Sequence, residues 1–180
     1  MRIEEREIAG VFSIIPHVLE DERGGFFRTY CKNELAKITD SEFVQMNHSI
    51  NLKKGTLRGL HFQTPPHSED KIVRCIRGAV YDVFVDVRKD SPTFLQWGSR
   101  LLSAENKELL FLPRGIAHGF ITLEDQTELL YQHSNFYTPN SEGALRYNDP
   151  ILSITWPIEP IVISERDKNH PLLTPDFKGI

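Results

Sequence analysis

Three things are scarce in this sequence: cysteine, net positive charge and long apolar runs. Only Cys31 and Cys75 occur among 180 residues, too few for the disulfide framework of a secreted protein, so we expect the reducing cytoplasm. The net charge of −4 at pH 7 offers no cationic surface for a nucleic-acid backbone. No segment has the ~20 apolar residues of a membrane span, and MRIEEREIAG at the start lacks the pattern of a signal peptide. We therefore expect neither a nucleic-acid partner nor a membrane partner.

The sequence does contain many short apolar or alternating segments, separated by Gly, Pro, Asn and Asp. In AVYDVFVDVR, residues 79–88, apolar side chains alternate with Asp82 and Asp86, which is typical of a strand with one packed face. The preceding break at Gly78 predicts a tight hairpin turn. Helical periodicity occurs only in CKNELAKI, residues 31–38. These features predict a mostly antiparallel all-β protein, either a sandwich or a barrel.

Length and proline content indicate how the chain is organised. A chain of 180 residues is long enough for one hydrophobic core and too short for two comfortable ones, so we expect a single domain over residues 1–180. The segment after Trp156 contains four prolines, at positions 157, 160, 171 and 175. Because proline disfavours regular helix and sheet, this segment is expected to run extended around the domain.

Two segments, GTLRGLHFQ and PRGIAH, resemble the paired motifs of the cupin jelly rolls. Metal-binding cupins carry His-x-His and a glutamate there, because a divalent metal needs three or four nitrogen and oxygen ligands. In this chain Gln63 replaces the second histidine, and a neutral amide oxygen is a weak ligand. The remaining metal candidates are His61, His118 and Glu69. The alternative is that the two histidines are merely hydrogen-bonded strand residues.

Six motifs in a fixed order resemble the dTDP-4-dehydrorhamnose 3,5-epimerase family over nearly the whole chain: KGTLRGLHFQTPP, KIVRCIRGAVYDVFVDVRKDSPTF, LPRGIAHGF, LLYQHSNFYTPNSEG, NDP with ITWP, and SERD. The resemblance implies a cupin-type jelly-roll barrel with short flanking helices and an extended C-terminal segment. It also implies a homodimer that works without a metal or another cofactor. The expected activity is inversion of C3 and C5 of a nucleotide-linked 4-keto-6-deoxyhexose.

Epimerisation next to a ketone needs a base, a group that holds the enolate oxygen, and an acid on the other face. His61 suits the base, since an imidazole with an ordinary pKa of about 6.5 is partly neutral at pH 7. By resemblance, Asp167 orients His61, Lys71 holds the enolate and Tyr131 is the acid. From the residues alone, a lysine at a strand start is usually exposed and a tyrosine on an apolar strand face is usually core.

Arg58 can form the forked hydrogen bonds that a nucleotide phosphate accepts. Residues three apart on a regular strand point to opposite faces, so Arg58 and His61 can share a site only if Gly59 marks a bulge. The resemblance adds further substrate contacts: Arg23, Gln45, Asn47, Ser49, His118 and Tyr137.

The chain departs from the family pattern in DERGGFFRTY, where Arg28 and Gly25 replace a glutamate and an aromatic residue. Recognition of the base is therefore less defined than the sugar chemistry. A single-carbon epimerase, or one that acts on another nucleotide sugar, is the nearest alternative. A metal-dependent cupin enzyme and a silent sugar-nucleotide binding module are further alternatives, and the complete set of proton-transfer residues argues against the silent module.

Overall fold

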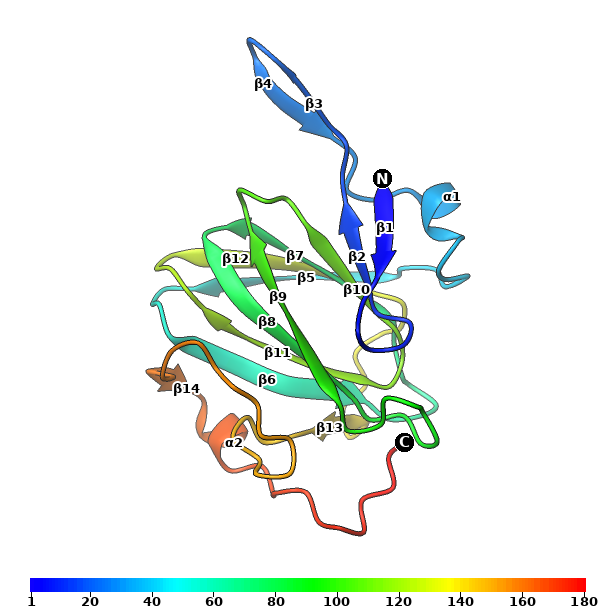
Figure 1. Ribbon diagram of the computed structural model, residues 1–180, viewed down its shortest axis with the longest axis vertical. Helices are drawn as coiled ribbons and strands as arrows, with labels where there is room; N and C mark the ends of the chain where they lie inside the picture. Colours follow the sequence, from blue (N-terminus) through cyan, green and yellow to red (C-terminus); the bar gives the residue numbers. More distant parts are fainter.

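Two β-sheets face each other in the computed structural model, which describes residues 1–180 (Figure 1). The first sheet has the strand order β1 (Arg2–Glu5), β2 (Phe12–Ile15), β10 (Leu109–Leu112), β7 (Lys71–Arg77), β12 (Thr127–His133) and β5 (Gln45–Asn51). The second has the order β13 (Glu142–Ala144), β6 (Thr56–Gln63), β11 (Ile116–Thr122), β8 (Ala79–Asp86) and β9 (Trp97–Ser103), with β14 (Val162–Ile163) beside β6. This arrangement confirms the predicted all-β jelly roll.

Three small elements lie outside these sheets. The hairpin of β3 (Val18–Asp21) and β4 (Gly24–Phe27) projects away from the barrel (Figure 1). The two helices are single turns, α1 (Lys32–Leu35) and α2 (Glu165–Lys168). The helix predicted near residue 31 is therefore present but short, and Cys31 gives it no side-chain cap. No helix is long and apolar enough to cross a membrane.

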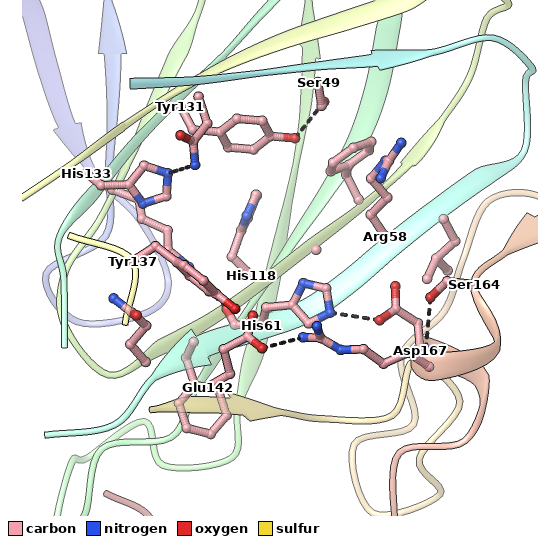
Figure 2. Close-up of a pocket in the computed structure, with 18 of the residues that line it drawn as sticks. Ser49, Arg58, His61, His118, Tyr131, His133, Tyr137, Glu142, Ser164 and Asp167 are labelled. Carbon is pink, nitrogen blue, oxygen red and sulfur yellow. Dashed lines mark hydrogen bonds and ion pairs between the residues drawn. The ribbon is translucent and has the colours of Figure 1, made fainter. Parts of the chain in front are cut away.

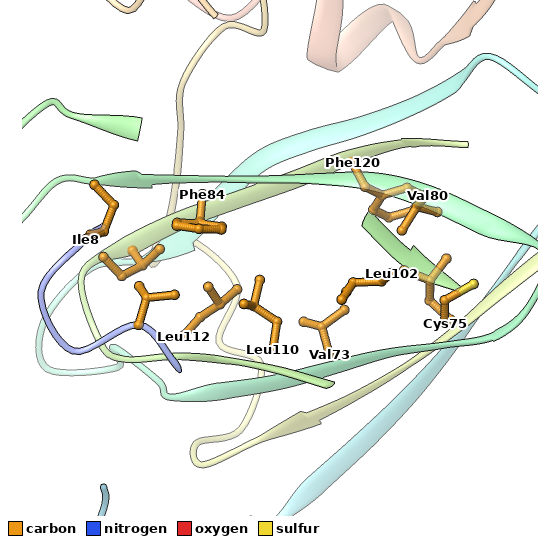
Figure 3. Packing of buried hydrophobic residues seen from close by; sticks show 12 residues of the cluster. Ile8, Val73, Cys75, Val80, Phe84, Leu102, Leu110, Leu112 and Phe120 are labelled. Atoms are coloured by element: carbon orange, nitrogen blue, oxygen red, sulfur yellow. The ribbon is translucent and has the colours of Figure 1, made fainter. Parts of the chain in front are cut away.

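The main core lies between the two sheets (Figure 3). Val73 and Leu110 on the first sheet meet Val80, Phe84 and Phe120 on the second, and all five are buried. The two inner faces interdigitate in this way along one half of the barrel. The other half is left open and carries polar side chains, so the same sheets provide both a core and a cavity.

Strand β8 is buried on both faces, so the prediction that only one of its faces is packed is wrong. Val83 and Val85 point outward but are covered by the chain after Trp156, including Phe177 and Ile180. The Ile180 N–H donates to the Val87 carbonyl at 2.8 Å, which fixes the end of the chain against the barrel. The predicted extended C-terminal segment is confirmed, and its packing accounts for the second buried face.

The turn at Gly78 connects the two sheets and does not form a hairpin. Strand β7 belongs to the first sheet and β8 to the second, and the two strands do not pair. Gly78 has φ +70°, in the left-handed region that favours glycine. The prediction of a sharp turn was correct, but local sequence does not show that the following strand pairs elsewhere.

Candidate active site

A cavity of about 770 Å³ opens between the two sheets, a volume suited to a ligand the size of a nucleotide sugar. Side chains from β5, β6, β7, β11, β12, β13, β14 and α2 line it. Ten of the eleven site residues expected from the sequence are among the lining residues: Gln45, Asn47, Ser49, Arg58, His61, Lys71, His118, Tyr131, Tyr137 and Asp167. The fold thus gathers residues that are up to 122 positions apart, from 45 to 167, around one space.

His61 and Asp167 form a hydrogen-bonded dyad at the edge of this cavity (Figure 2). His61 Nε2 lies 2.8 Å from Asp167 Oδ1, while the Gly59 N–H donates to Asp167 Oδ2 at 3.3 Å. A proton on Nε2 of His61 serves this contact, which leaves Nδ1 unprotonated in the neutral ring. The geometry therefore prepares Nδ1 as a base.

Local structure after β14 brings Asp167 to this position. Strand β14 runs parallel to β6, with Val162 opposite Thr56, and the chain then turns into α2. Ser164 caps α2, because its Oγ accepts from the Asp167 N–H at 3.0 Å. The motif SERD is therefore a capped turn that holds its aspartate next to the histidine of the neighbouring strand.

The environment keeps Asp167 ionised. Burial by itself would raise the pKa of the carboxyl, but the hydrogen bond and the charge of His61, together with the Gly59 N–H, lower it to about 2. The side chain of Asp167 is only 6 % exposed, whereas that of His61 is 35 % exposed and open to the cavity. A fixed negative charge thus stands behind a ring that can take a proton from a ligand.

A bulge in β6 places Arg58 and His61 in the same site, as predicted. On β11, His118 pairs with His61 and Phe120 pairs with Arg58, so three steps along β6 match two steps along β11. Gly59 has φ +119°, and a Cβ there would lie 2.7 Å from the His118 carbonyl oxygen. Only glycine fits this close approach.

Lys71 is buried in the cavity, so the alternative of an exposed lysine at a strand start is excluded. Its Nζ lies 3.0 Å from Glu69 Oε1 and donates to the His61 carbonyl at 3.2 Å. Glu69 also accepts from the Gln63 side chain. The Gln63 amide oxygen accepts from the Thr138 N–H at 2.8 Å. Glu69 and Gln63 therefore serve to hold Lys71 and the adjoining loop, rather than to complete a cupin metal site.

Tyr131 enters the cavity from the opposite sheet to His61 (Figure 2). Its hydroxyl lies 3.0 Å from Ser49 Oγ. Burial raises the pKa of the phenol well above its ordinary value, with a smaller opposing effect from the Ser49 hydrogen bond. Tyr131 is therefore protonated at neutral pH and available as a donor.

His118 has a buried carboxylate partner that the sequence did not reveal. His118 Nε2 lies 2.8 Å from Asp82 Oδ2, and both residues are buried. Burial raises the pKa of Asp82, opposed by the neighbouring His118. The prediction that Asp82 lies on the polar face of its strand was wrong, because the even positions of β8 face the barrel interior. The sequence feature that could have indicated this contact was an aspartate surrounded by apolar residues in one strand.

His133 lines the cavity but was not predicted as part of the site. Burial, together with the smaller effect of the positive charges of Lys71 and His118, lowers the pKa of His133 to about 4. Its Nε2 lies 3.3 Å from Asn47 Nδ2. His133 is therefore neutral at pH 7. His133 follows Tyr131 by two residues and therefore shares its strand face, which is the sequence feature that could have placed it in the site.

Arg23 is the one predicted site residue that the fold does not bring to the cavity. It lies at the turn between β3 and β4, its side chain is 85 % exposed, and its guanidinium pairs with Asp21. Arg28, the departure from the family pattern, also lies outside and pairs with Glu34 at 2.7 Å. Within one chain, neither residue can contact a ligand in this cavity.

The sequence is similar to one known protein family over nearly its whole length. A family model described as dTDP-4-dehydrorhamnose 3,5-epimerase matches residues 5–175. A protein of that name from Salmonella typhimurium is 45 % identical over 96 % of this chain and 96 % of its own length.

Two solved structures extend this similarity to the fold. A dTDP-6-deoxy-D-glucose-3,5-epimerase from Legionella pneumophila, in complex with dTDP-4-keto-L-rhamnose, has a TM-score of 0.90 and 37 % identity, covering 95 % of this chain and 92 % of that one. A 3′-monoepimerase from Streptomyces bikiniensis, in complex with dTDP-quinovose, has a TM-score of 0.86 and 34 % identity, covering 93 % and 85 %.

Proposed function

The chain belongs to the dTDP-4-dehydrorhamnose 3,5-epimerase family, and from this premise we propose the mechanism by which it inverts C3 and C5 of dTDP-4-dehydro-6-deoxyglucose. The observation that carries the mechanism is the His61–Asp167 dyad on one wall of the cavity with the Tyr131 hydroxyl on the opposite wall. A base and an acid on opposite sides of a sugar ring are what inversion at carbon requires.

His61 is the base. The C–H bonds at C3 and C5 are acidic because the carbanion that forms delocalises onto the 4-keto oxygen. Nδ1 of His61 takes the proton, and the ring becomes an imidazolium whose charge is balanced by Asp167, 2.8 Å from Nε2. Asp167 thus orients the ring and stabilises its charged form, without taking the proton itself.

Lys71 holds the enolate. Its ammonium lies in the cavity and is only 10 % exposed, where a fixed positive charge interacts strongly with a developing oxyanion. Glu69 holds the ammonium in place through the contact at 3.0 Å. His118, held by Asp82 at 2.8 Å, lies opposite His61 on the neighbouring strand β11 and lines the same cavity.

Tyr131 returns a proton to the face opposite His61. After protonation, the carbon has the inverted configuration and the enolate is again a ketone. Throughout the reaction, Arg58 anchors the diphosphate of the substrate. The rest of the substrate is contacted by Gln45, Asn47, Ser49 and Tyr137. Arg58 is already oriented by a hydrogen bond of 2.7 Å from Nε to Asn51 Oδ1.

A homodimer would explain why Arg23 lies outside the cavity of its own chain. The β3–β4 hairpin projects from the barrel and exposes Leu19 and Phe26, which are 58 % and 76 % exposed (Figure 1). An apolar side chain at that exposure favours a covering partner. We propose that a second copy of the chain receives this hairpin, which brings Arg23 to the nucleotide in the partner's cavity. The two free thiols support the cytoplasm as the compartment of this single-domain dimer.

Arg23→Ala should raise the KM for the dTDP-sugar about tenfold or more with little change in kcat, because a charge-assisted hydrogen bond is lost before chemistry. Steady-state kinetics measures the split. Lys37→Ala, which removes an exposed cation elsewhere, is the matched control. Sedimentation analysis should show a dimer that Phe26→Asp converts to a monomer with the same raised KM. A wild-type monomer, or an unchanged KM in Arg23→Ala, contradicts the proposal.

The reaction itself is tested by incubating the protein with dTDP-4-dehydro-6-deoxyglucose in deuterated buffer and following C3 and C5 by NMR. We expect deuterium at both carbons and the 4-keto-rhamnose product. Deuterium and inversion at only one carbon would support the single-carbon alternative, which the similarity to a 3′-monoepimerase keeps open. Absence of exchange at both carbons in folded protein would overturn the assignment.

A further inference from the structure

A second imidazole stands behind the His61–Asp167 dyad. His170 follows α2, and its Nε2 lies 3.5 Å from Asp167 Oδ1, the same oxygen that His61 contacts at 2.8 Å. The His61 and His170 rings are 6.1 Å apart and nearly perpendicular. His170 Nε2 is buried and has no hydrogen-bond partner. The mechanism above does not use this nitrogen, so its position next to a buried carboxylate needs another explanation.

We propose that His61, Asp167 and His170 form an inhibitory binding site for a divalent transition metal of the Zn²⁺ class. One donor atom from each residue lies within 4.8 Å of the other two. Two imidazole nitrogens and one carboxylate oxygen are a donor set that binds Zn²⁺, with water as the fourth ligand. The open cavity beside His61 supplies that water and a route of entry.

The spacing of the donors fits a metal with small adjustments. Tetrahedral Zn²⁺ with bonds of about 2.0–2.1 Å places its ligands roughly 3.3 Å apart. The His61–Asp167 and Asp167–His170 separations of 2.8 Å and 3.5 Å lie on either side of this value. The largest adjustment is that the two imidazole donors, which lie within 4.8 Å of each other, have to approach, and His170 lies outside the regular strands and helices.

Other groups in the cavity are less suited to a metal. His118 already contacts Asp82 at 2.8 Å. His133 lies 4.0 Å from Glu69, but the Lys71 ammonium occupies the space next to that carboxylate, and a second cation there would be repelled. The unused nitrogen of His170 distinguishes the proposed site from these pairs.

Metal binding at this site would switch off the base, a consequence that rests on the proposed function. As a base, His61 needs its proton on Nε2 and a lone pair on Nδ1. A metal bound to Nε2 displaces that proton, and the neutral ring then carries its proton on Nδ1, toward the substrate. No net proton is gained or lost. The ring keeps its place but can no longer accept a proton from carbon.

Equilibrium dialysis against Zn²⁺, and against Co²⁺ with its visible absorption spectrum, tests the site directly. We expect one ion per chain and a four-coordinate Co²⁺ spectrum. Loss of a supporting contact around a metal already weakens binding by about 10–100-fold, so His170→Gln should weaken it at least about tenfold. Asp167→Asn should do the same. His17→Gln, which removes an exposed histidine elsewhere, is the matched control and should bind normally.

Activity provides a second measurement. Zn²⁺ should inhibit the wild type and His17→Gln reversibly, with recovery on addition of a chelator. His170→Gln should retain zinc-free activity and resist inhibition. Equal inhibition of His170→Gln and wild type, or no bound ion in dialysis, overturns the proposal. Because dialysis does not depend on turnover, a failure of the proposed function would leave this test of the site intact.

Discussion

Replacing His61 with asparagine should lower kcat by about 10²–10⁴, the loss typical of a general base. Asparagine keeps a polar side chain near Asp167 but cannot accept a proton from carbon. Deuterium exchange should fall at C3 and C5 together, because one imidazole serves both carbons. Steady-state rates and NMR exchange measure the two effects. His61 is 35 % exposed, so the fold should survive the substitution, and thermal unfolding can verify this.

The matched control is His17→Asn, which removes an exposed histidine outside the cavity and should leave both rates unchanged. The informative contrary result is exchange that persists at one carbon in His61→Asn. That outcome would mean that a second base serves this carbon. His118 would then be the candidate, since Asp82 at 2.8 Å supports it in the way that Asp167 supports His61.

The sequence predicted the residues of the site better than their partners. His61, Lys71 and Tyr131 were identified because the family motifs are contiguous stretches of chain. Asp167 was also named as the partner of His61, but the carboxylates that contact His118 and Lys71, which are Asp82 and Glu69, were not identified as their partners. Asp82 and His118 lie on different strands, and Glu69 precedes Lys71 by only two residues, but both contacts depend on which side chains point inward. A single bulge or a covering segment changes which side chains are buried, and the local alternation of apolar and polar residues reveals neither.

Two corrections show the same limit at the level of the fold. The alternating pattern of β8 indicated one packed face, but the chain after Trp156 covers the other face and buries both. Arg23 was assigned to the substrate, yet within one chain it lies at the tip of a projecting hairpin. In each case the decisive neighbour is distant: for β8 it is the far end of the chain, and for Arg23 it is the second copy in the dimer that we propose.

Tyr131→Phe should separate proton abstraction from inversion. The substitution removes one hydroxyl, which contacts Ser49 Oγ at 3.0 Å, and keeps the ring that packs near His118. His61 remains able to remove the proton and to return a solvent deuteron to the same face. We therefore expect deuterium to enter at C3 and C5 with retained configuration, while formation of the inverted product falls by about 10²–10⁴.

Time-resolved NMR in deuterated buffer measures exchange and product stereochemistry in one experiment. The matched control is Tyr81→Phe, since Tyr81 packs on the outer face of the barrel against Trp156, away from the cavity. If Tyr131→Phe still inverts both carbons at the wild-type rate, then the acid is another group or a water. If exchange and inversion are lost together, Tyr131 acts before abstraction, by positioning the sugar. Only exchange without inversion places the two proton transfers on opposite walls, with His61 on one sheet and the phenol on the other.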